Sequence, residues 1–368
     1  MSHLPVPARA ALVAMVALLG FVAIDLSGDD DLTGYLRVGE FSSARAFVEA
    51  DIPDTHIVPG WGHDGQANYV LARALPDLHD AQGHLDSVTY RARRIVYPAL
   101  ASVLPPGHAT VAGLLALNVM ATGIAAAGLT PIVRRLGGHW LVAATVALTP
   151  AFIASTIISL GDGLGLALAA AGVALWRRPR ATAWAVTLFA LAALTRETTL
   201  VIPAAVFLWE GRGRRRWLLL PPAALVAWMG VLQTWIGDAG KSAAQFTAPF
   251  AGWLDQGIAT EEIVVAMVLL VASLWVASEL WPLDRTWSTI VLFDAAVLVL
   301  VDRAVLFNLL NLARVVPWVV PFGILLATRR RTVDEPASRP RSADEDRLGG
   351  EGDAMVDGLV HRAPSRNV

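Results

Sequence analysis

Residues 177–216 read RRPRATAWAVTLFALAALTRETTLVIPAAVFLWEGRGRRR, which is two apolar stretches enclosed by arginines at both ends. Membrane proteins concentrate Arg and Lys in cytoplasmic loops, so a single helix through this segment would place one arginine group on the wrong side. A helical hairpin that turns near Thr195-Arg196-Glu197 keeps both groups on the cytoplasmic side. The segment therefore predicts two membrane-crossing helices whose connecting turn lies outside the cytoplasm.

The same reasoning, applied along the chain, predicts an all-α, polytopic transmembrane helical bundle. A membrane-crossing helix needs about 20 apolar residues. The expected spans, about ten in number, are residues 10–26, 109–133, 140–158, 163–176, 181–194, 199–209, 217–236, 263–280, 287–301 and 315–328. The arginines that fix their direction are Arg134, Arg135, Arg177, Arg178, Arg180, Arg212, Arg214, Arg215, Arg216, Arg285, Arg329, Arg330 and Arg331. We therefore expect a transmembrane domain over residues 1–328 whose hairpin turns are extracytoplasmic.

The composition favours a membrane environment and excludes several kinds of site. Hydrophobic residues make up 55% of the 368-residue chain and charged residues only 16%, which is unusually apolar for a soluble domain. Cysteine is absent, which excludes disulfides, thiolate metal sites and a cysteine nucleophile. Lys241 is the only lysine, and the abundance of Arg, Ala, Gly and Val is typical of a high-GC bacterial genome. We expect a multi-pass protein of the bacterial cytoplasmic membrane with no nucleic-acid partner.

Three segments outside the spans differ in character. The first extracytoplasmic loop, residues 28–94, is too long for a simple connector, and its aromatic and aliphatic residues indicate an ordered structure. At its end, residues 90–100 form an amphipathic pattern that predicts a helix on the membrane surface. A second extracytoplasmic loop is expected at residues 237–262. The tail, residues 329–368, is rich in charge, Pro, Ser and Gly, and predicts a disordered cytoplasmic segment.

The motif Gly62-His63-Asp64-Gly65-Gln66 is the clearest candidate site in the first loop. Flanking glycines let the backbone approach a ligand closely and leave the Asp64 carboxylate uncrowded, which suits a general base or a metal ligand. A solvated Gly/Asp turn would give the same pattern. The histidines of this loop lack the spacing of a histidine-built metal site.

Charged residues at the other turns form a second group of candidates. Asp162 precedes an apolar stretch and is fully explained as the N-cap of a helix that begins at Gly163. Arg196 and Glu197 could form a structural ion pair with each other, yet ionisable residues near a span are costly and by default suggest function. Arg196 and Arg314 also lie on the side that arginine otherwise avoids. A guanidinium there is well suited to a lipid phosphate, because its planar fork donates two hydrogen bonds.

With these residues placed, the sequence resembles bacterial membrane glycosyltransferases of the GT-C type that take part in cell-surface glycopolymer formation. The resemblance rests on GHDGQANY at residues 62–69 and YRARRIVYP at residues 90–98, which are similar to a D-G-Q segment and a Y-R-x-R-R-I-x-Y-P segment of the family. Gly161-Asp162, LTRET at residues 194–198, and Arg314 with Pro317 also resemble the family pattern. The likeness extends from residue 62 to about residue 321. His63, Ala67 and Asn68 depart from the pattern, which leaves the substrate open.

The resemblance implies an enzyme that takes a sugar from a polyprenyl-phosphate donor and attaches it to a glycan, lipid or protein acceptor on the extracytoplasmic face. Asp64 stands at the position of the family's catalytic base, and a single displacement would invert the anomeric configuration. The leaving phosphate needs cations at the membrane surface. The residues expected to bind substrate are Gln66, Tyr69, Arg93, Arg94, Asp162, Arg196, Glu197 and Arg314, with headgroup anchoring an equal alternative for Arg93 and Arg94.

Some alternatives stay open at this point. A divalent cation could be shared by Asp64 and Asp162, although no complete ligand set is visible in the sequence. A transporter or lipid-carrier flippase would also need arginines at lipid-phosphate depth, but transporters tend to have repeated halves and charges near the bilayer midplane, which this sequence lacks. A scaffold of a cell-envelope assembly would use the tail for docking and would leave Asp64 without a role. All these interpretations share membrane lipids as partners.

Overall fold

The computed structural model describes residues 3–27, 31–237, 248–254, 260–301, 312 and 314–334. The chain divides into two compact units, Met1–Arg329 and Arg330–Val368, and of the second unit only the end of one helix is described. Several sequence predictions lie outside the described residues: the tail after residue 334, most of the second predicted loop, and most of the turn between the last two predicted spans. The first unit contains every residue discussed below.

The described part is mostly helical. Its α-helices are α1 (Val6–Asp25), α2 (Arg45–Asp51), α3 (Asp64–Ala74), α4 (Val88–Ala92), α5 (Val96–Ala101), α6 (His108–Arg135), α7 (Leu141–Ala144), α8 (Pro150–Ile157), α9 (Asp162–Trp176), α10 (Thr182–Thr195), α11 (Val201–Trp209), α12 (Leu220–Trp235), α13 (Thr260–Leu280), α14 (Arg285–Leu300) and α17 (Val319–Asp334). Its 3-10 helices are η1 (Leu32–Leu36), η2 (Leu78–Ala81), η3 (Thr145–Leu148), η4 (Pro179–Ala181), η5 (Glu197–Leu200), η6 (Arg212–Leu219) and η7 (Gly252–Leu254). Two short parallel strands, β1 (Val38–Gly39) and β2 (Ile57–Val58), pair Val38 with Ile57.

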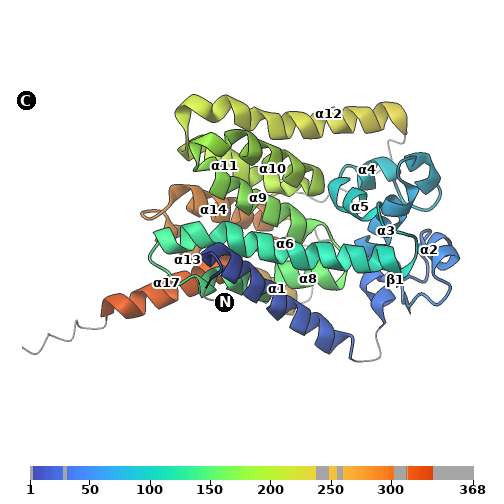
Figure 1. Ribbon diagram of the computed structural model, residues 1–368, viewed down its shortest axis with the longest axis horizontal. Helices are drawn as coiled ribbons and strands as arrows, with labels where there is room; N and C mark the ends of the chain where they lie inside the picture. The colour runs from blue at the N-terminus through green and yellow to red at the C-terminus, as the bar shows by residue number, and fades with distance from the viewer. Residues whose placement is uncertain are drawn as a thin grey trace, which may run out of the picture. The chain divides into compact units, whose positions relative to one another are not determined.

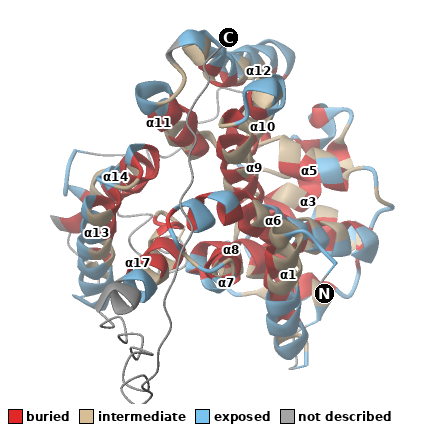
Figure 2. Cartoon of the chain, turned by 60° about the vertical axis from the view of Figure 1, so that its left-hand side comes forward, coloured by how far each residue is buried: buried red, intermediate tan, exposed pale blue. Residues whose placement is uncertain are grey.

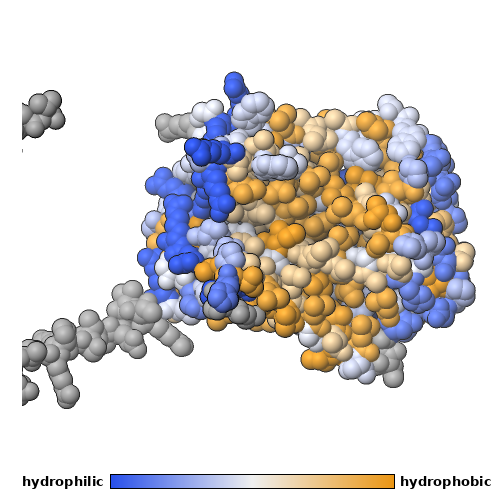
Figure 3. Space-filling view, viewed as in Figure 1, coloured by the Kyte–Doolittle hydropathy of each residue, from blue (hydrophilic) through white to orange (hydrophobic). Residues whose placement is uncertain are grey.

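Four helical segments are long and apolar enough to cross a membrane, judged by length and composition. They are Val6–Asp25, His108–Arg135, Gly213–Trp235 and Thr260–Leu280. Several other predicted spans form shorter apolar helices, such as α9 and α11. In Figure 3 apolar residues cover the middle of the visible face, and hydrophilic residues gather at its two ends. This distribution is the one expected of a membrane-associated helical protein.

One predicted span is not a continuous helix. Residues 140–158 divide into α7, η3 and α8, with the break at Thr149-Pro150. Proline has no backbone N–H and disfavours the helical conformation of the residue before it, so Thr149 is extended with ψ of 136° and α8 starts afresh at Pro150. The prediction of one helix over this stretch was therefore wrong.

Helix α9 lies at the centre of the bundle, packed between α6 and α10 (Figures 1 and 2). Small residues allow these helices to approach closely: a Cβ at Gly128 of α6 would lie 2.9 Å from the backbone nitrogen of Ala171 in α9. Such small-residue contacts are typical of helix packing in membranes. By contrast, α12 and α13 expose much of their apolar surface (Figure 2).

Residues 31–107, most of which belong to the long loop predicted before the second span, fold into a small helical cap that contains α2 to α5 and both strands. Figure 1 places this cap at one end of the bundle, which we call the loop end. The expected surface helix over residues 90–100 is instead two short helices, α4 and α5, whose residues Ala92 and Tyr97 are buried. The indole N–H of Trp228 in α12 donates to the carbonyl of Ala92 at 2.9 Å. This segment therefore packs against the protein itself.

Candidate functional site

Asp64 is the first residue of α3, and close backbone packing fixes its position. Gly62 has a φ of 70°, and a Cβ there would lie 2.3 Å from the carbonyl oxygen of Arg37. A Cβ on Gly65 would lie 2.6 Å from the carbonyl oxygen of Ile158. The sequence interpretation assigned these glycines to the approach of a ligand, whereas in the structure they allow the approach of neighbouring backbone. The motif thus holds Asp64 rigidly at the helix N-terminus, where the helix dipole favours a negative charge.

Gln66 and Tyr69, both expected to bind substrate, make hydrogen bonds within the protein. The Gln66 amide accepts from the Gly39 N–H at 3.1 Å and donates to the Trp61 carbonyl at 2.8 Å. The fully buried Tyr69 hydroxyl donates to Asp51 at 2.9 Å and accepts from the backbone N–H of Gly107 at 2.9 Å. Neither side chain lines the pocket described below. Both stabilise the loop that presents Asp64.

The Asp64 carboxylate is bound by Arg91, a residue that the sequence interpretation left out of the site. The Arg91 guanidinium donates to Asp64 Oδ1 at 2.6 Å and, through its other N–H groups, to both oxygens of the exposed Asp86 at 2.8 and 3.0 Å. Burial opposes the ionised form of Asp64, but Arg91, Arg314 and Arg94 outweigh it and hold the pKa of its carboxyl well below the usual range. Asp64 is therefore ionised at neutral pH.

Asp162 is not the helix cap that the sequence predicted. It is the first residue of α9, Gly161 occupies the N-cap position, and the first-turn N–H of Gly163 donates to the Ser155 hydroxyl at 3.0 Å. Its carboxylate instead binds two arginines: Oδ2 accepts from Arg314 at 2.8 Å, and Oδ1 lies 3.1 Å from Arg196 Nε. The side chains of Asp162 and Arg314 are 10% and 9% exposed, so this cluster is largely removed from water.

Glu197 pairs with the α4–α5 connection and not with its neighbour Arg196. Arg94 donates to both carboxylate oxygens of Glu197, at 2.9 and 2.7 Å, and Arg93 lies 3.4 Å from the same carboxylate. Arg93 also stacks over the ring of Tyr90, with its guanidinium carbon 4.1 Å from the ring centre. A forked contact of this kind fixes an arginine plane. Arg94 is consequently a positioned residue of the protein interior, and the headgroup-anchor alternative does not describe it.

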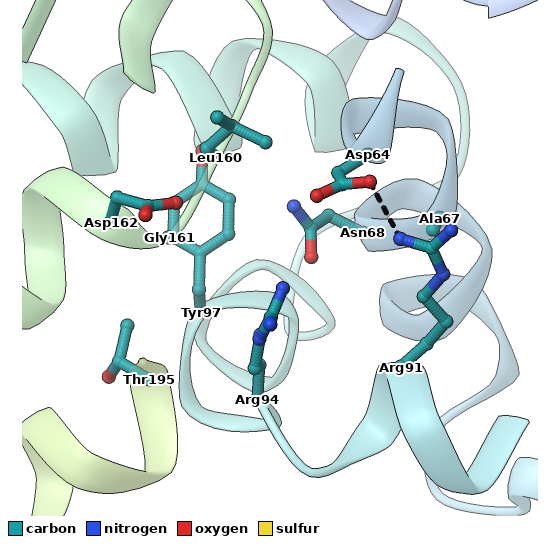
Figure 4. Close-up of a pocket in the computed structure, with 10 residues that line it drawn as sticks. All are labelled: Asp64, Ala67, Asn68, Arg91, Arg94, Tyr97, Leu160, Gly161, Asp162 and Thr195. Carbon is teal, nitrogen blue, oxygen red and sulfur yellow. Dashed lines mark hydrogen bonds and ion pairs between the residues drawn. The ribbon is translucent and has the colours of Figure 1, made fainter. Parts of the chain in front are cut away.

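These charged groups surround one narrow pocket, whose space is about 370 Å³ when the open solvent at its mouth is included. Its lining residues are Asp64, Ala67, Asn68, Arg91, Arg94, Tyr97, Leu160, Gly161, Asp162 and Thr195. Figure 4 shows the carboxylates of Asp64 and Asp162 on opposite sides of the pocket, with Arg94 reaching between them. Arg196 and Arg314 join the site through Asp162. Thus the loop motif and two hairpin turns, which lie about 100 and 130 residues later in the sequence, converge on one cavity.

Sequence reasoning missed four polar residues of this lining: Asn68, Arg91, Tyr97 and Thr195. Arg91 had a usable signal, since it belongs to the same YRARR segment as Arg93 and Arg94. Asn68 donates to the Ser159 carbonyl at 2.8 Å and joins α3 to the turn before α9. The Tyr97 hydroxyl donates to Leu114 and accepts from Asn118, both at 2.8 Å. The roles of these residues depend on tertiary contacts that no local pattern reveals.

The site suits an anion better than a metal ion. Among the described residues no three His, Asp or Glu side chains are grouped so as to hold a metal. Asp64 and Asp162 are instead engaged by arginines. Counted over the described residues alone, the arginines 91, 93, 94, 196 and 314 around the pocket outnumber the carboxylates of Asp64, Asp86, Asp162 and Glu197 by one, and by two without the exposed Asp86. Guanidinium groups of this kind bind phosphate oxygens through paired hydrogen bonds.

Comparison with family models, with curated proteins and with solved structures finds no match to this chain.

Proposed function

We propose that the protein is an integral membrane glycosyltransferase of the GT-C type, which moves a sugar from a polyprenyl-phosphate donor to a glycan, lipid or protein acceptor of the cell envelope. One observation carries the proposal: the ionised carboxylate of Asp64 lines a pocket with Arg91, Arg94 and Asp162, and Arg93, Arg196 and Arg314 lie behind this lining on Glu197 and Asp162, at the polar end of an apolar helical bundle. Such a pocket combines a proton acceptor with a phosphate site. The proposed topology is multi-pass, with about ten spans and the loop end on the extracytoplasmic face.

In the proposed reaction the acceptor hydroxyl attacks the anomeric carbon of the sugar. The bond between that carbon and the donor phosphate oxygen breaks, and the polyprenyl phosphate leaves with the bonding electrons. Asp64 takes the hydroxyl proton as a general base, and the product has the inverted anomeric configuration. A pocket with Asp64 on one side and Asp162 with its arginines on the other suits this division of roles (Figure 4).

The donor phosphate is assigned to Arg94, Arg196 and Arg314. Their carboxylate partners hold these guanidinium groups in place before the substrate arrives, so little reorganisation is needed as charge develops on the leaving phosphate. Asp162 and Glu197 are then positioning residues, which act on the substrate through the arginines they bind.

The contact between Arg91 and Asp64 bears on when Asp64 becomes an effective base. A carboxylate bound to a guanidinium at 2.6 Å is ionised but accepts a proton poorly. In the proposed mechanism the donor phosphate, bound by Arg94, Arg196 and Arg314, also attracts Arg91, which lines the same pocket. The contact between Arg91 and Asp64 then loosens, and the basicity of Asp64 rises when the acceptor is in place. The exposed Asp86 gives Arg91 a second carboxylate partner throughout.

The direct test measures transfer of radiolabelled sugar from polyprenyl-phosphate donors, supplied one at a time, in membranes that contain the protein. Asp64→Asn keeps the shape of the side chain and removes the base, and we expect transfer to fall by about 10²- to 10⁴-fold. Asp86→Asn is the matched control, because Asp86 shares Arg91 with Asp64 but does not line the pocket. This control should transfer sugar within a few-fold of the wild type.

Two outcomes would contradict the assignment. Full transfer by the Asp64→Asn protein would remove Asp64 from the reaction. Absence of transfer by the wild type with every donor, together with measurable movement of the lipid carrier across the bilayer, would favour the flippase alternative. A product that retains the donor's anomeric configuration would exclude the single displacement alone.

A further inference from the structure

The end of the bundle opposite the cap carries a second pocket, larger than the first and outside the proposed reaction. It encloses about 1020 Å³ and is widely open. Arginines from four separate chain connections line it, namely Arg135, Arg177, Arg214 and Arg285, together with the carboxylates of Glu210 and Asp284. We call this end the arginine end. Four arginines against two carboxylates leave the pocket with a formal charge of +2.

The arginines of this pocket differ in the contacts that they make with other protein groups. Arg177 binds Glu210 at 2.6 Å and Asp284 at 2.8 Å. Arg214 lies over the Trp176 ring and Arg285 over the Trp209 ring, with guanidinium carbons 4.7 and 5.3 Å from the ring centres. Arg135 makes no hydrogen bond or ion pair with a described residue. The positive charge is thus held in place but only partly neutralised.

An apolar groove continues from this pocket into the bundle. It spans about 580 Å³, including space open to solvent, and shares Arg135 and Arg177 with the charged pocket. Its other lining residues are Gly128, Pro131 and Ile132 of α6, Val173 and Ala174 of α9, Arg178, and Trp287 of α14. Gly128 packs against the backbone of α9, so the room for a narrow hydrocarbon chain lies beside the small side chain of Ala174. A positively charged pocket that leads directly into an apolar groove is complementary to an amphiphile with an anionic headgroup and a hydrocarbon chain.

We propose that the arginine end binds an anionic phospholipid, with the headgroup phosphate between Arg135 and Arg177 and one acyl chain in the groove. The shared arginines carry the argument, since they place the positive charge at the mouth of the apolar groove. A free phosphate would fill only the charged pocket and would leave the apolar groove empty. Basic pockets between membrane helices on the cytoplasmic side bind anionic headgroups in this way. This site is separate from the proposed transfer reaction, and lipid binding here does not depend on whether that reaction occurs.

The test titrates the purified full chain, in a neutral detergent, with phosphatidylglycerol and follows bound lipid by native mass spectrometry. We expect one tightly bound phosphatidylglycerol and at least tenfold weaker binding of phosphatidylcholine, whose headgroup is neutral overall. Arg135→Gln should weaken phosphatidylglycerol binding about fivefold, the effect of one basic residue near an anionic lipid. Arg134→Gln is the matched control, because this neighbouring exposed arginine lines neither cavity.

A second variant tests the groove. Ala174→Phe fills the space for the acyl chain, so it should weaken phosphatidylglycerol binding and leave the binding of inorganic phosphate, measured by calorimetry, unchanged. Equal binding of both lipids, equal effects of Arg134→Gln and Arg135→Gln, or undiminished lipid binding by Ala174→Phe would each overturn the proposal. Inorganic phosphate that binds as tightly as phosphatidylglycerol would identify a free-anion site in its place.

Discussion

Arginines are concentrated at both ends of the bundle, but the two ends differ in how far these arginines are buried and paired with carboxylates. At the loop end the side chains of Arg94 and Arg314 are 14% and 9% exposed, and each is held by a carboxylate. At the arginine end Arg135 is exposed and has no polar partner among the described residues, while Arg214 and Arg285 rest on tryptophan rings. Buried, paired charges have fixed positions, which a reaction needs. Exposed charges adapt to what approaches them, which suits orientation in the membrane and lipid contact.

The largest difference in stability between the two ends is expected from a change at Asp162. Asp162→Asn leaves Arg196 and Arg314 close together without their shared counter-charge, and we expect the free energy of unfolding to fall by about 3 to 5 kcal/mol, as when one member of a buried ion pair is removed. Chemical unfolding of the purified protein in detergent measures the loss. A change below about 1 kcal/mol, the value typical of exposed pairs, would show that water reaches the cluster freely.

A smaller loss is expected for the corresponding carboxylate at the arginine end. Asp284→Asn removes a charged partner of Arg177, yet Arg177 keeps Glu210, and asparagine can still accept the Trp287 N–H that caps α14. We expect a loss of about 1.5 to 3 kcal/mol, the range for a hydrogen bond to a charged group. The same unfolding experiment applies. A loss as large as that of Asp162→Asn would mean that both ends fix their charges equally.

The pH dependence of the proposed sugar transfer tests how strongly the arginines of the pocket control the charge of Asp64. The folded-state pKa of Asp64 is lowered, so its carboxylate stays ionised as the pH falls from 7 to 5, and its contribution to stability is lost only below the unfolded-state pKa. Arg91→Gln removes the nearest positive charge, raises the pKa of Asp64, and should move the acid limb of the transfer rate to higher pH. A pH–rate profile in membranes measures this, and an unmoved acid limb would assign it to another group.

The smallest effect is expected for an exposed pair of the cap. Arg45 and Glu49 are 2.8 Å apart on α2, with side chains 41% and 36% exposed. Glu49→Gln should change the free energy of unfolding by less than about 1 kcal/mol. A larger loss on chemical unfolding would show that the cap is stabilised by surface charge and that burial is not what separates the strong pairs from the weak ones.

Much of this arrangement follows from the sequence, and what does not follow has a physical reason. Hydropathy and arginine positions predict the apolar helices and nominate Arg196 and Arg314, because burial of apolar surface and the cost of buried charge act locally. The glycine-flanked motif nominates Asp64. The choice of partners does not follow. Glu197 binds Arg94, 103 residues earlier, and not the adjacent Arg196, because the packing of α10 against α5 decides which guanidinium the carboxylate meets. The break before Pro150 was readable from the proline itself.

The glycines beside Asp64 have a consequence for how this pocket can diversify. Any side chain at Gly62 or Gly65 would collide with the backbone of another segment and push α3 away, so changes there are expected to abolish the site and not to alter its preference. Ala67 also lines the pocket but sits within α3, where larger residues keep the helix intact. A library designed to redirect the protein towards other substrates should therefore vary Ala67 and leave both glycines unchanged.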